Sequence, residues 1–335
     1  MRPAKEMGIR GLTAMLIAST LLLGACQGNK EVKMSTALQE QKLQFTCIKE
    51  ADHLPPLDSQ ADVWFKQARA MQKAEGIKNY DTIASLYRQA AAKDHYKAMI
   101  NLQNMLYQGL VKPAHGKDVP EEVIELSQRL MKLGVPGGYY SMGQYLENGY
   151  GVKWDKAASL AYFRKGADLG SPEGQYVIAK LLLTGQFEDT SNPDPYVVHF
   201  KPNPAYRPEI GKVMLDCAAN QGNAEAADWL AGWYQLSQKD YKNALKYYQL
   251  AVKNGHDLSA LQLEESFNGP LSTDRGNYLG VTKDPERVRR YTLIEHEIDS
   301  NPSARFPDID KIVPLPPAEL PEWDGTFEYK KESQQ

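Results

Sequence analysis

Long apolar stretches are scarce in this chain, and neither sign of charge dominates it. The most apolar stretch, from Leu12 to Ala25, is shorter than the about 20 residues that a helix needs to cross a bilayer. This length argues against a membrane-spanning anchor. The formal net charge is −3 and no basic patch occurs, so the composition does not indicate binding to nucleic acid.

Catalytic and metal-binding patterns are lacking as well. Ser141 lies between Gly138 and Gly143, close to the Gly-x-Ser-x-Gly pattern, but it falls inside a predicted helix rather than on a strand-to-helix turn. The six histidines form no ligand set with cysteine or carboxylate at metal-binding spacing. His-x-Lys occurs, but without the aspartate that completes a phospholipase D motif. We therefore expect no catalytic site, metal or cofactor.

Cysteine is rare, and the first one marks an export signal. Basic residues precede an apolar stretch at 15–23, and small residues end at Cys26, which is the anatomy of a signal peptide. Residues 23–26 resemble a lipobox, which implies cleavage after residue 25 and lipidation of Cys26. Acyl chains would then hold the protein at a membrane. Because Gln27 is not an aspartate, the resemblance implies the periplasmic face of the outer membrane.

Only Cys47 and Cys217 remain after lipidation. In an oxidising compartment such a pair can form a disulfide. The segment 48–59 can reach about 40 Å when extended, enough to run beside several repeats. We expect the bridge; the alternative is that Cys217 is a small buried residue ahead of Ala218 and Ala219.

Internal similarity with a period of about 36 residues is the strongest signal in the chain. Each copy has a small residue, with large residues four and eight positions later, which places all three on one face of a helix. The small residues are Ala98, Gly138, Gly174, Ala226 and Ser259. A second amphipathic stretch precedes each copy and ends at a turn, at Asp94, Gly134, Gly170, Gly222 and Gly255. The pattern predicts about five antiparallel helix pairs and no sheet core.

Residues 138–152, followed by Asp155-Lys156-Ala157, resemble a Sel1-like repeat, a relative of the tetratricopeptide repeat. The resemblance covers about residues 80–270 and implies an all-α, right-handed superhelical solenoid. A helix from Ser59 to Ala74 is expected to cap its beginning. Where Gln103 and Glu264 replace the small residue of the family, the helices are expected to approach less closely.

A solenoid offers a long curved surface for binding another protein. In the related tetratricopeptide fold, defined positions of the first helix in each pair face the groove. Transferred to this chain, these candidate partner-binding positions are Tyr107, Tyr140, Gln144, Glu147, Glu173, Tyr176, Lys180 and Asp228. The alternative for each is an ordinary exposed helix surface.

The insert at 186–208 lengthens the step between the third and fourth copies and is rich in proline. Proline stiffens a loop, so its aromatic side chains, including Tyr196 and Phe200, would lose little entropy on binding a partner. The alternative is an ordered crossing segment packed on the solenoid. Both remain open at the level of sequence.

A helix from about Pro285 to Ser300 is predicted after the repeats, followed by a proline-rich segment at 305–325. This segment is expected to be extended rather than helical and to cover the last hydrophobic face of the stack. The predicted organisation is a signal peptide at 1–25, a lipidated tether at 26–58, repeats at 59–270 and a C-terminal region at 271–335.

The ending resembles one particular group of Sel1-like lipoproteins. Phe306, Pro307, residues 310–317 and residues 323–325 are similar to the tails of proteins encoded beside phospholipase effectors of the type VI secretion system. The resemblance implies an immunity protein that binds such an effector. The alternative is an envelope scaffold or signalling adaptor that binds another periplasmic or host protein.

Overall fold

The structure, a computed structural model, describes residues 44–74, 76–188 and 200–328. The signal peptide, Cys26 and Tyr196 lie outside the described residues. Most of the described residues are helical, which confirms the all-α prediction. Within these ranges, no helix is both long and apolar enough to cross a membrane.

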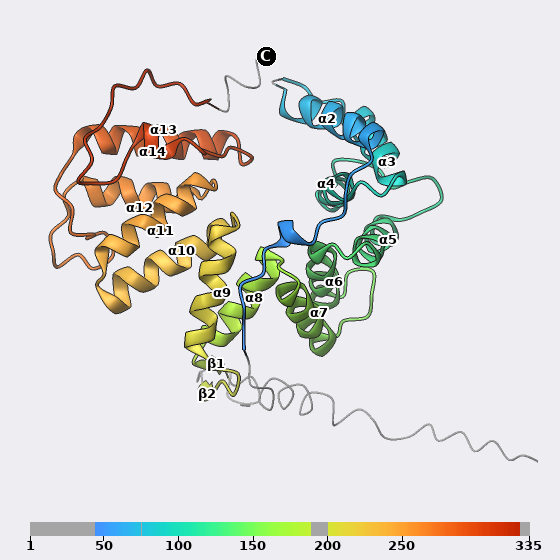
Figure 1. The fold of residues 1–335 in the computed structure, drawn as a ribbon, viewed down its shortest axis with the longest axis horizontal. Coiled ribbons are helices and arrows are strands. Elements are labelled where there is room, and N and C mark those ends of the chain that lie inside the picture. Colours follow the sequence, from blue (N-terminus) through green and yellow to red (C-terminus); the bar gives the residue numbers. More distant parts are fainter. Residues whose placement is uncertain (1–43, 75, 189–199, 329–335) are drawn as a thin grey trace, which may run out of the picture.

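The helices follow one another around an open arc (Figure 1). A short 3-10 turn, η1 (Glu50–Asp52), comes first. The helices of the arc are α2 (Ser59–Lys73), α3 (Tyr80–Ala92), α4 (Tyr96–Tyr107), α5 (Val119–Lys132), α6 (Pro136–Asn148), α7 (Lys156–Asp168), α8 (Pro172–Leu183), α9 (Pro208–Asn220), α10 (Ala224–Trp233), α11 (Tyr241–Lys253), α12 (Asp257–Phe267) and α13 (Pro285–Ser300). A π-helical turn, η2 (Tyr234–Gln238), extends α10.

Each helix packs mainly on its neighbours in sequence, as in a solenoid. The helices that carry the small residues of the repeat, α4, α6, α8, α10 and α12, pack on α5, α7, α9, α11 and α13. Each also packs on the helix that precedes it, and α3/α4, α5/α6, α7/α8, α9/α10 and α11/α12 are the five expected helix pairs. Helix α2 packs on α3 at the N-terminal end, where the sequence predicts a capping helix.

The turn residues have the expected backbone conformation. Asp94, Gly134, Gly170, Gly222 and Gly255 all have positive φ, with 58° at Asp94 and 104° at Gly170. Glycine adopts this left-handed conformation without steric cost and commonly ends a helix. The turns are therefore short and return the chain directly into the next helix.

Small residues let the helices approach closely, as the repeat predicts. A Cβ added at Gly138 would lie 2.9 Å from the backbone nitrogen of Met131 on α5, and one added at Gly143 would lie 2.6 Å from the ring of Phe163. At Gln103, where a looser approach is expected, a polar side chain fills the space between the helices. This side chain is buried and donates a hydrogen bond of 2.8 Å to the carbonyl of Val123, which links α4 to α5.

The hydrophobic core consists of two clusters. One extends from Ala61 to Tyr145, and the other from Phe163 to Phe327. The boundary between the two clusters falls between α6 and α7, although these helices pack closely through Gly143 and Phe163. Residues 44–58, which we call the strap, contact both clusters through Phe45, Leu54 and Leu57.

The C-terminal segment caps the stack, with one correction to its predicted conformation. Phe306, Ile309 and Val313 are fully buried in the second cluster. Residues Ile309–Ile312 form a short helix, α14, although the proline-rich segment was expected to contain no helix. No proline lies between Pro307 and Pro314, so one helical turn that buries two isoleucines can form there.

The insert begins and ends as a two-stranded antiparallel sheet. Strand β1 (Gln186–Glu188) pairs with β2 (Phe200–Pro202), and residues 189–199 between them lie outside the described residues. Asn203 is buried and donates hydrogen bonds to the carbonyls of Leu181 and Thr184. The end of the insert therefore packs on the solenoid, while Phe200 remains 62% exposed.

Candidate protein-binding site

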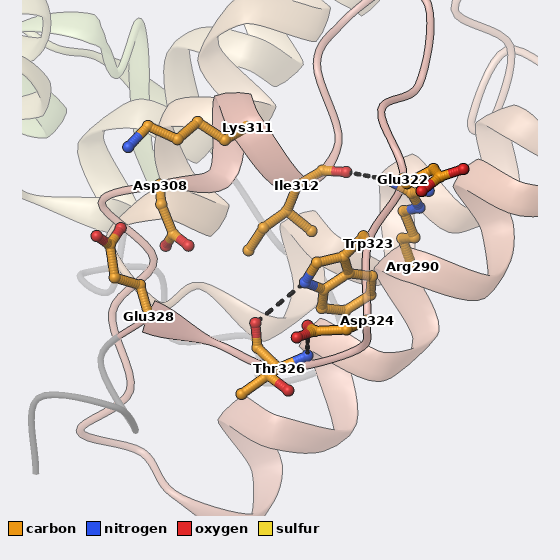
Figure 2. Close-up of a pocket in the computed structure, with 9 residues that line it drawn as sticks. All are labelled: Arg290, Asp308, Lys311, Ile312, Glu322, Trp323, Asp324, Thr326 and Glu328. Carbon is orange, nitrogen blue, oxygen red and sulfur yellow. Dashed lines mark hydrogen bonds between the residues drawn. The ribbon is translucent and has the colours of Figure 1, made fainter. Parts of the chain in front are cut away.

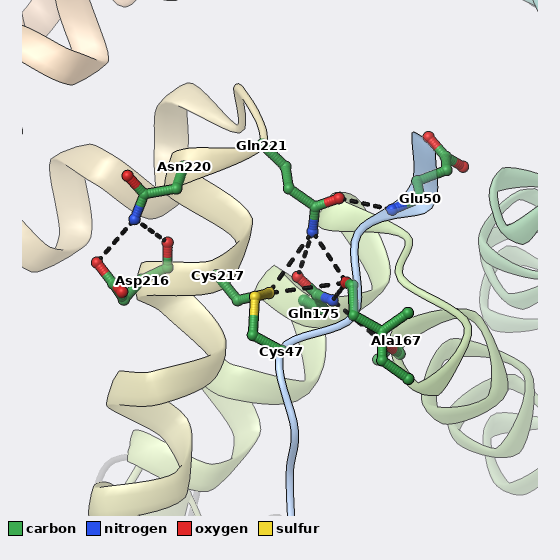
Figure 3. The surroundings of a disulfide bond; sticks show 9 residues. Cys47, Glu50, Ala167, Gln175, Asp216, Cys217, Asn220 and Gln221 are labelled. Atoms are coloured by element: carbon green, nitrogen blue, oxygen red, sulfur yellow. Dashed lines mark hydrogen bonds between the residues drawn. A yellow bond between two sulfur atoms is a disulfide. The ribbon is translucent and has the colours of Figure 1, made fainter. Parts of the chain in front are cut away.

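The strap runs along the inner side of the arc, from α9 to α2 (Figure 1). Cys47 and Cys217 form a disulfide, as the sequence predicts, with their Cα atoms 5.6 Å apart. Figure 3 shows Gln175 and Gln221 beside this bridge. Gln175 donates to the carbonyl of Ile48 at 3.0 Å. The strap is thus fastened to α8 and α9 before it reaches the N-terminal half.

Glu50 fastens the strap at a second place. Its backbone nitrogen donates to Oε1 of Gln221 at 2.7 Å. Its carboxylate accepts a hydrogen bond of 3.0 Å from the backbone nitrogen of Gly137, in the first turn of α6. Burial and, secondly, the charge of Glu173 raise the pKa of Glu50 to about 7, although the Gly137 hydrogen bond opposes this change.

Glu50→Gln is expected to stabilise the protein at pH 8 and to have little effect at pH 4. The pKa of Glu50 is raised in the folded state, so its ionised form is less favourable there than in the unfolded chain. This free-energy cost is absent below the pKa that Glu50 has in the unfolded chain, and it reaches its full value above about pH 7. The amide oxygen can still accept from Gly137. Urea unfolding at both pH values should show a gain of about 1 to 3 kcal/mol at pH 8 only.

The exposed residue Glu121 on α5 provides the control for this charge change. Glu121→Gln removes the same charge without touching the strap, and its effect should be small at both pH values. An equal effect of Glu50→Gln at pH 4 and pH 8 would contradict the assigned titration.

The central candidates Tyr140 and Tyr176 lie in one acidic environment. Burial raises the pKa of Tyr140 to about 12, followed by the charges of Glu173, Glu225 and Glu147. Burial and the charge of Glu225 also raise the pKa of Glu173, whose carboxylate accepts from the hydroxyl of Ser171 at 3.1 Å. The structure therefore brings together side chains from α6, α8 and α10.

Other predicted site residues have different surroundings. Tyr107 is exposed and its ring lies 5.3 Å from that of Tyr150, in a separate aromatic group. Asp228 accepts from the hydroxyl of Ser259 at 2.7 Å, so it connects α10 to α12. Lys180 lies 5.2 Å from the centre of the Tyr176 ring. Gln144 is exposed on α6, and Phe200 lies on β2, outside the repeat helices.

Two acidic residues of this region were missed by the sequence analysis. Glu225 precedes the small residue Ala226 as Glu173 precedes Gly174, so the repeat alignment contains the signal for it. Glu50 lies in the strap, outside the repeats, and no pattern in the sequence indicates its position. Only the folded path of the strap places it near Glu173.

A pocket of about 890 Å³ lies at the C-terminal cap, away from these residues (Figure 2). Trp323 lines it and donates from Nε1 to the carbonyl of Thr326 at 3.1 Å. Arg290, on α13, donates to the carbonyls of Ile312 and Pro321. Its guanidinium holds the C-terminal segment on α13, so we assign this region to the cap.

No group of three or more histidine, cysteine or carboxylate side chains in the described part of the chain could hold a metal ion. The candidate protein-binding surface instead consists of two half-buried tyrosines among carboxylates, on the helices α6, α8 and α10. Tyrosine is favoured in interfaces because its ring is apolar and its hydroxyl can form hydrogen bonds.

Comparison with known proteins supports a protein partner for this chain. A family model described as a domain of unknown function, DUF6396, matches residues 259–335. No curated protein matches the chain. Among solved structures, the immunity protein PA5088 from Pseudomonas aeruginosa has 29% identity and a TM-score of 0.63, covering 82% of this chain and 95% of that chain. Pseudomonas aeruginosa 5086 (PA5086) has 29% identity and a TM-score of 0.60, with the same coverage.

The immunity protein Pa5087 from Pseudomonas aeruginosa is 32% identical, with a TM-score of 0.62. The match covers 82% of this chain and 95% of that one, so it extends far beyond a single repeat. This chain belongs to the family of the immunity protein Pa5087.

Proposed function

We propose that this chain is an immunity protein that neutralises a type VI secretion phospholipase effector by binding it. The observation that carries the proposal is the family relationship, because the match with Pa5087 extends over nearly the whole of that immunity protein. The resemblance of the tail supports the choice of a phospholipase effector. Binding would block the effector in a stoichiometric complex, and the immunity protein itself would carry out no reaction.

The proposed location is the periplasmic face of the outer membrane, with Cys26 lipidated. An effector that attacks phospholipid acts at a membrane, and a tether raises the local concentration of the protein that binds it. The lipobox and the basic, apolar and small-residue order of the first 26 residues support this location.

The test is protection of a sensitive strain. The effector encoded beside this gene is directed to the periplasm, with or without this protein, and growth is measured. We expect survival only when the protein is present, and a complex in a pull-down. Cys26→Ala should reduce protection while leaving binding in solution intact.

Equal killing in both strains, together with no complex, would contradict the proposal and leave the scaffold alternative. A tyrosine variant refines the test. Tyr176→Ala is preferable to Tyr140→Ala, because the Tyr140 ring packs 5.7 Å from buried Phe163 and its loss would disturb the core. An anchor residue of an interface contributes about 2 kcal/mol or more.

A further inference from the structure

The inner side of the arc carries carboxylates that have no cationic partner. We define the acidic inner surface as Glu50, Tyr140, Glu147, Glu173, Tyr176 and Glu225. Within the described ranges, no lysine, arginine or histidine lies within ion-pair distance of its four carboxylates. Two other acids have such a partner: Arg88 lies 2.9 Å from Glu122, and Arg290 lies 2.7 Å from Glu286.

Two cations lie nearby, and neither forms an ion pair with these carboxylates. Lys180 lies over the ring of Tyr176 rather than on a carboxylate. Arg305 senses the charge of Glu225, but its guanidinium donates to the carbonyls of Pro302 and Ala304. Glu173 therefore repels both Glu50 and Glu225, as its charge acts on Glu50 and that of Glu225 acts on Glu173.

The tyrosines add a second requirement on the partner. Tyr140 and Tyr176 are half-buried on α6 and α8, and no hydrogen bond of either hydroxyl occurs within the described residues. The Tyr140 ring packs on Phe163 and Lys180 lies over the Tyr176 ring, so the parts of the two side chains left for a partner are their hydroxyls and ring edges, beside the carboxylates. A lysine or arginine side chain satisfies both features, since its apolar stem packs on an aromatic ring and its charged end reaches a carboxylate.

We propose that the acidic inner surface binds a basic segment of the effector, rich in lysine or arginine. The inference rests on the proposed function and adds the chemistry of the partner. A cationic segment would relieve the repulsion among the carboxylates, which an acidic or purely apolar segment would not. Partly desolvated charge pairs also steer association and select among partners. An anionic lipid has the opposite charge to the expected ligand of this surface.

The experiment measures affinity of the full mature protein for the effector encoded beside its gene. Glu173→Gln with Glu225→Gln is expected to weaken binding at least about tenfold. The matched control, Asp81→Asn with Glu121→Gln, removes the same charge from the exposed surfaces of α3 and α5 and should leave affinity unchanged. Raising the salt concentration should weaken wild-type binding more than that of the inner-surface variant.

A photo-reactive phenylalanine analogue in place of Tyr176 identifies the bound segment directly. Crosslinking to a lysine- or arginine-rich segment is expected; crosslinking to an acidic or apolar one would overturn the inference. Tight binding that is indifferent to both salt and Glu173→Gln with Glu225→Gln would overturn it while leaving the proposed function intact. Absence of any complex with the wild type would overturn both. Circular dichroism checks that all variants keep their helices.

Discussion

Loss of the Cys47–Cys217 disulfide should lower the free energy of unfolding by about 2 to 4 kcal/mol. The bridge closes a loop with a sequence separation of 170 residues, so the unfolded chain loses much conformational freedom when it is present. In the folded state it also holds the strap on α9. Urea unfolding of the wild type, with and without reductant, should show the difference.

The double variant Cys47→Ala with Cys217→Ala is the control, because reductant has no bridge to act on in it. Its unfolding midpoint should equal that of the reduced wild type and should not respond to reductant. Limited proteolysis should cut the strap faster once the bridge is removed. An unchanged midpoint of the wild type after verified reduction would contradict this prediction.

Gly174→Ala should destabilise the protein by about 2 to 3 kcal/mol, although alanine is the better helix former. A Cβ at position 174 would lie 2.8 Å from the backbone nitrogen of Ala167 and 3.1 Å from the carbonyl oxygen of Phe163. Both atoms belong to the backbone of α7, so the whole helix would have to move. The effect should appear as a lower urea midpoint.

Gly232 on α10 offers a matched comparison within the same repeat pattern. A Cβ at this position would meet only the hydroxyl of Tyr248, at 3.8 Å. Gly232→Ala should therefore be neutral or stabilising by up to about 1 kcal/mol. Equal destabilisation by both substitutions would show that close helix approach is not the cause.

The contrast between these glycines explains why so much of the fold was predictable. The repeat fixes small residues wherever a second helix passes close by, and Gly138 and Gly174 both contact the backbone of the preceding helix. These features are local, and the same physical requirement recurs in each copy.

The parts outside the repeat were less predictable. The pairing of β1 with β2 and the single turn of α14 depend on contacts between segments that do not repeat. At Gln103 the sequence shows that a small residue is replaced, but not that the buried amide donates a hydrogen bond to α5. A pattern of residue sizes does not reveal such a polar substitute.

The candidate site was predictable in part for the same reason. Tyr140 and Tyr176 occupy equivalent positions of neighbouring repeats, so their proximity follows from the period. Glu50 reaches the same region only because the disulfide and the hydrogen bonds of Gln221 and Gly137 guide the strap there. Contacts between residues so far apart in the sequence can be identified only from the folded structure.

The strap has a mechanical consequence. Repeats touch only their neighbours, so small rotations at successive interfaces add up and an unbraced stack flexes like a spring. The strap is covalently bound to α9 and runs along the inner side of the arc, so it restricts changes in the curvature of the stack. The partner would then meet a rigid template, with little entropy lost in shaping it. A longer or shorter strap would change the curvature of the arc. It would therefore change which partner fits, even with every side chain of the inner surface unchanged.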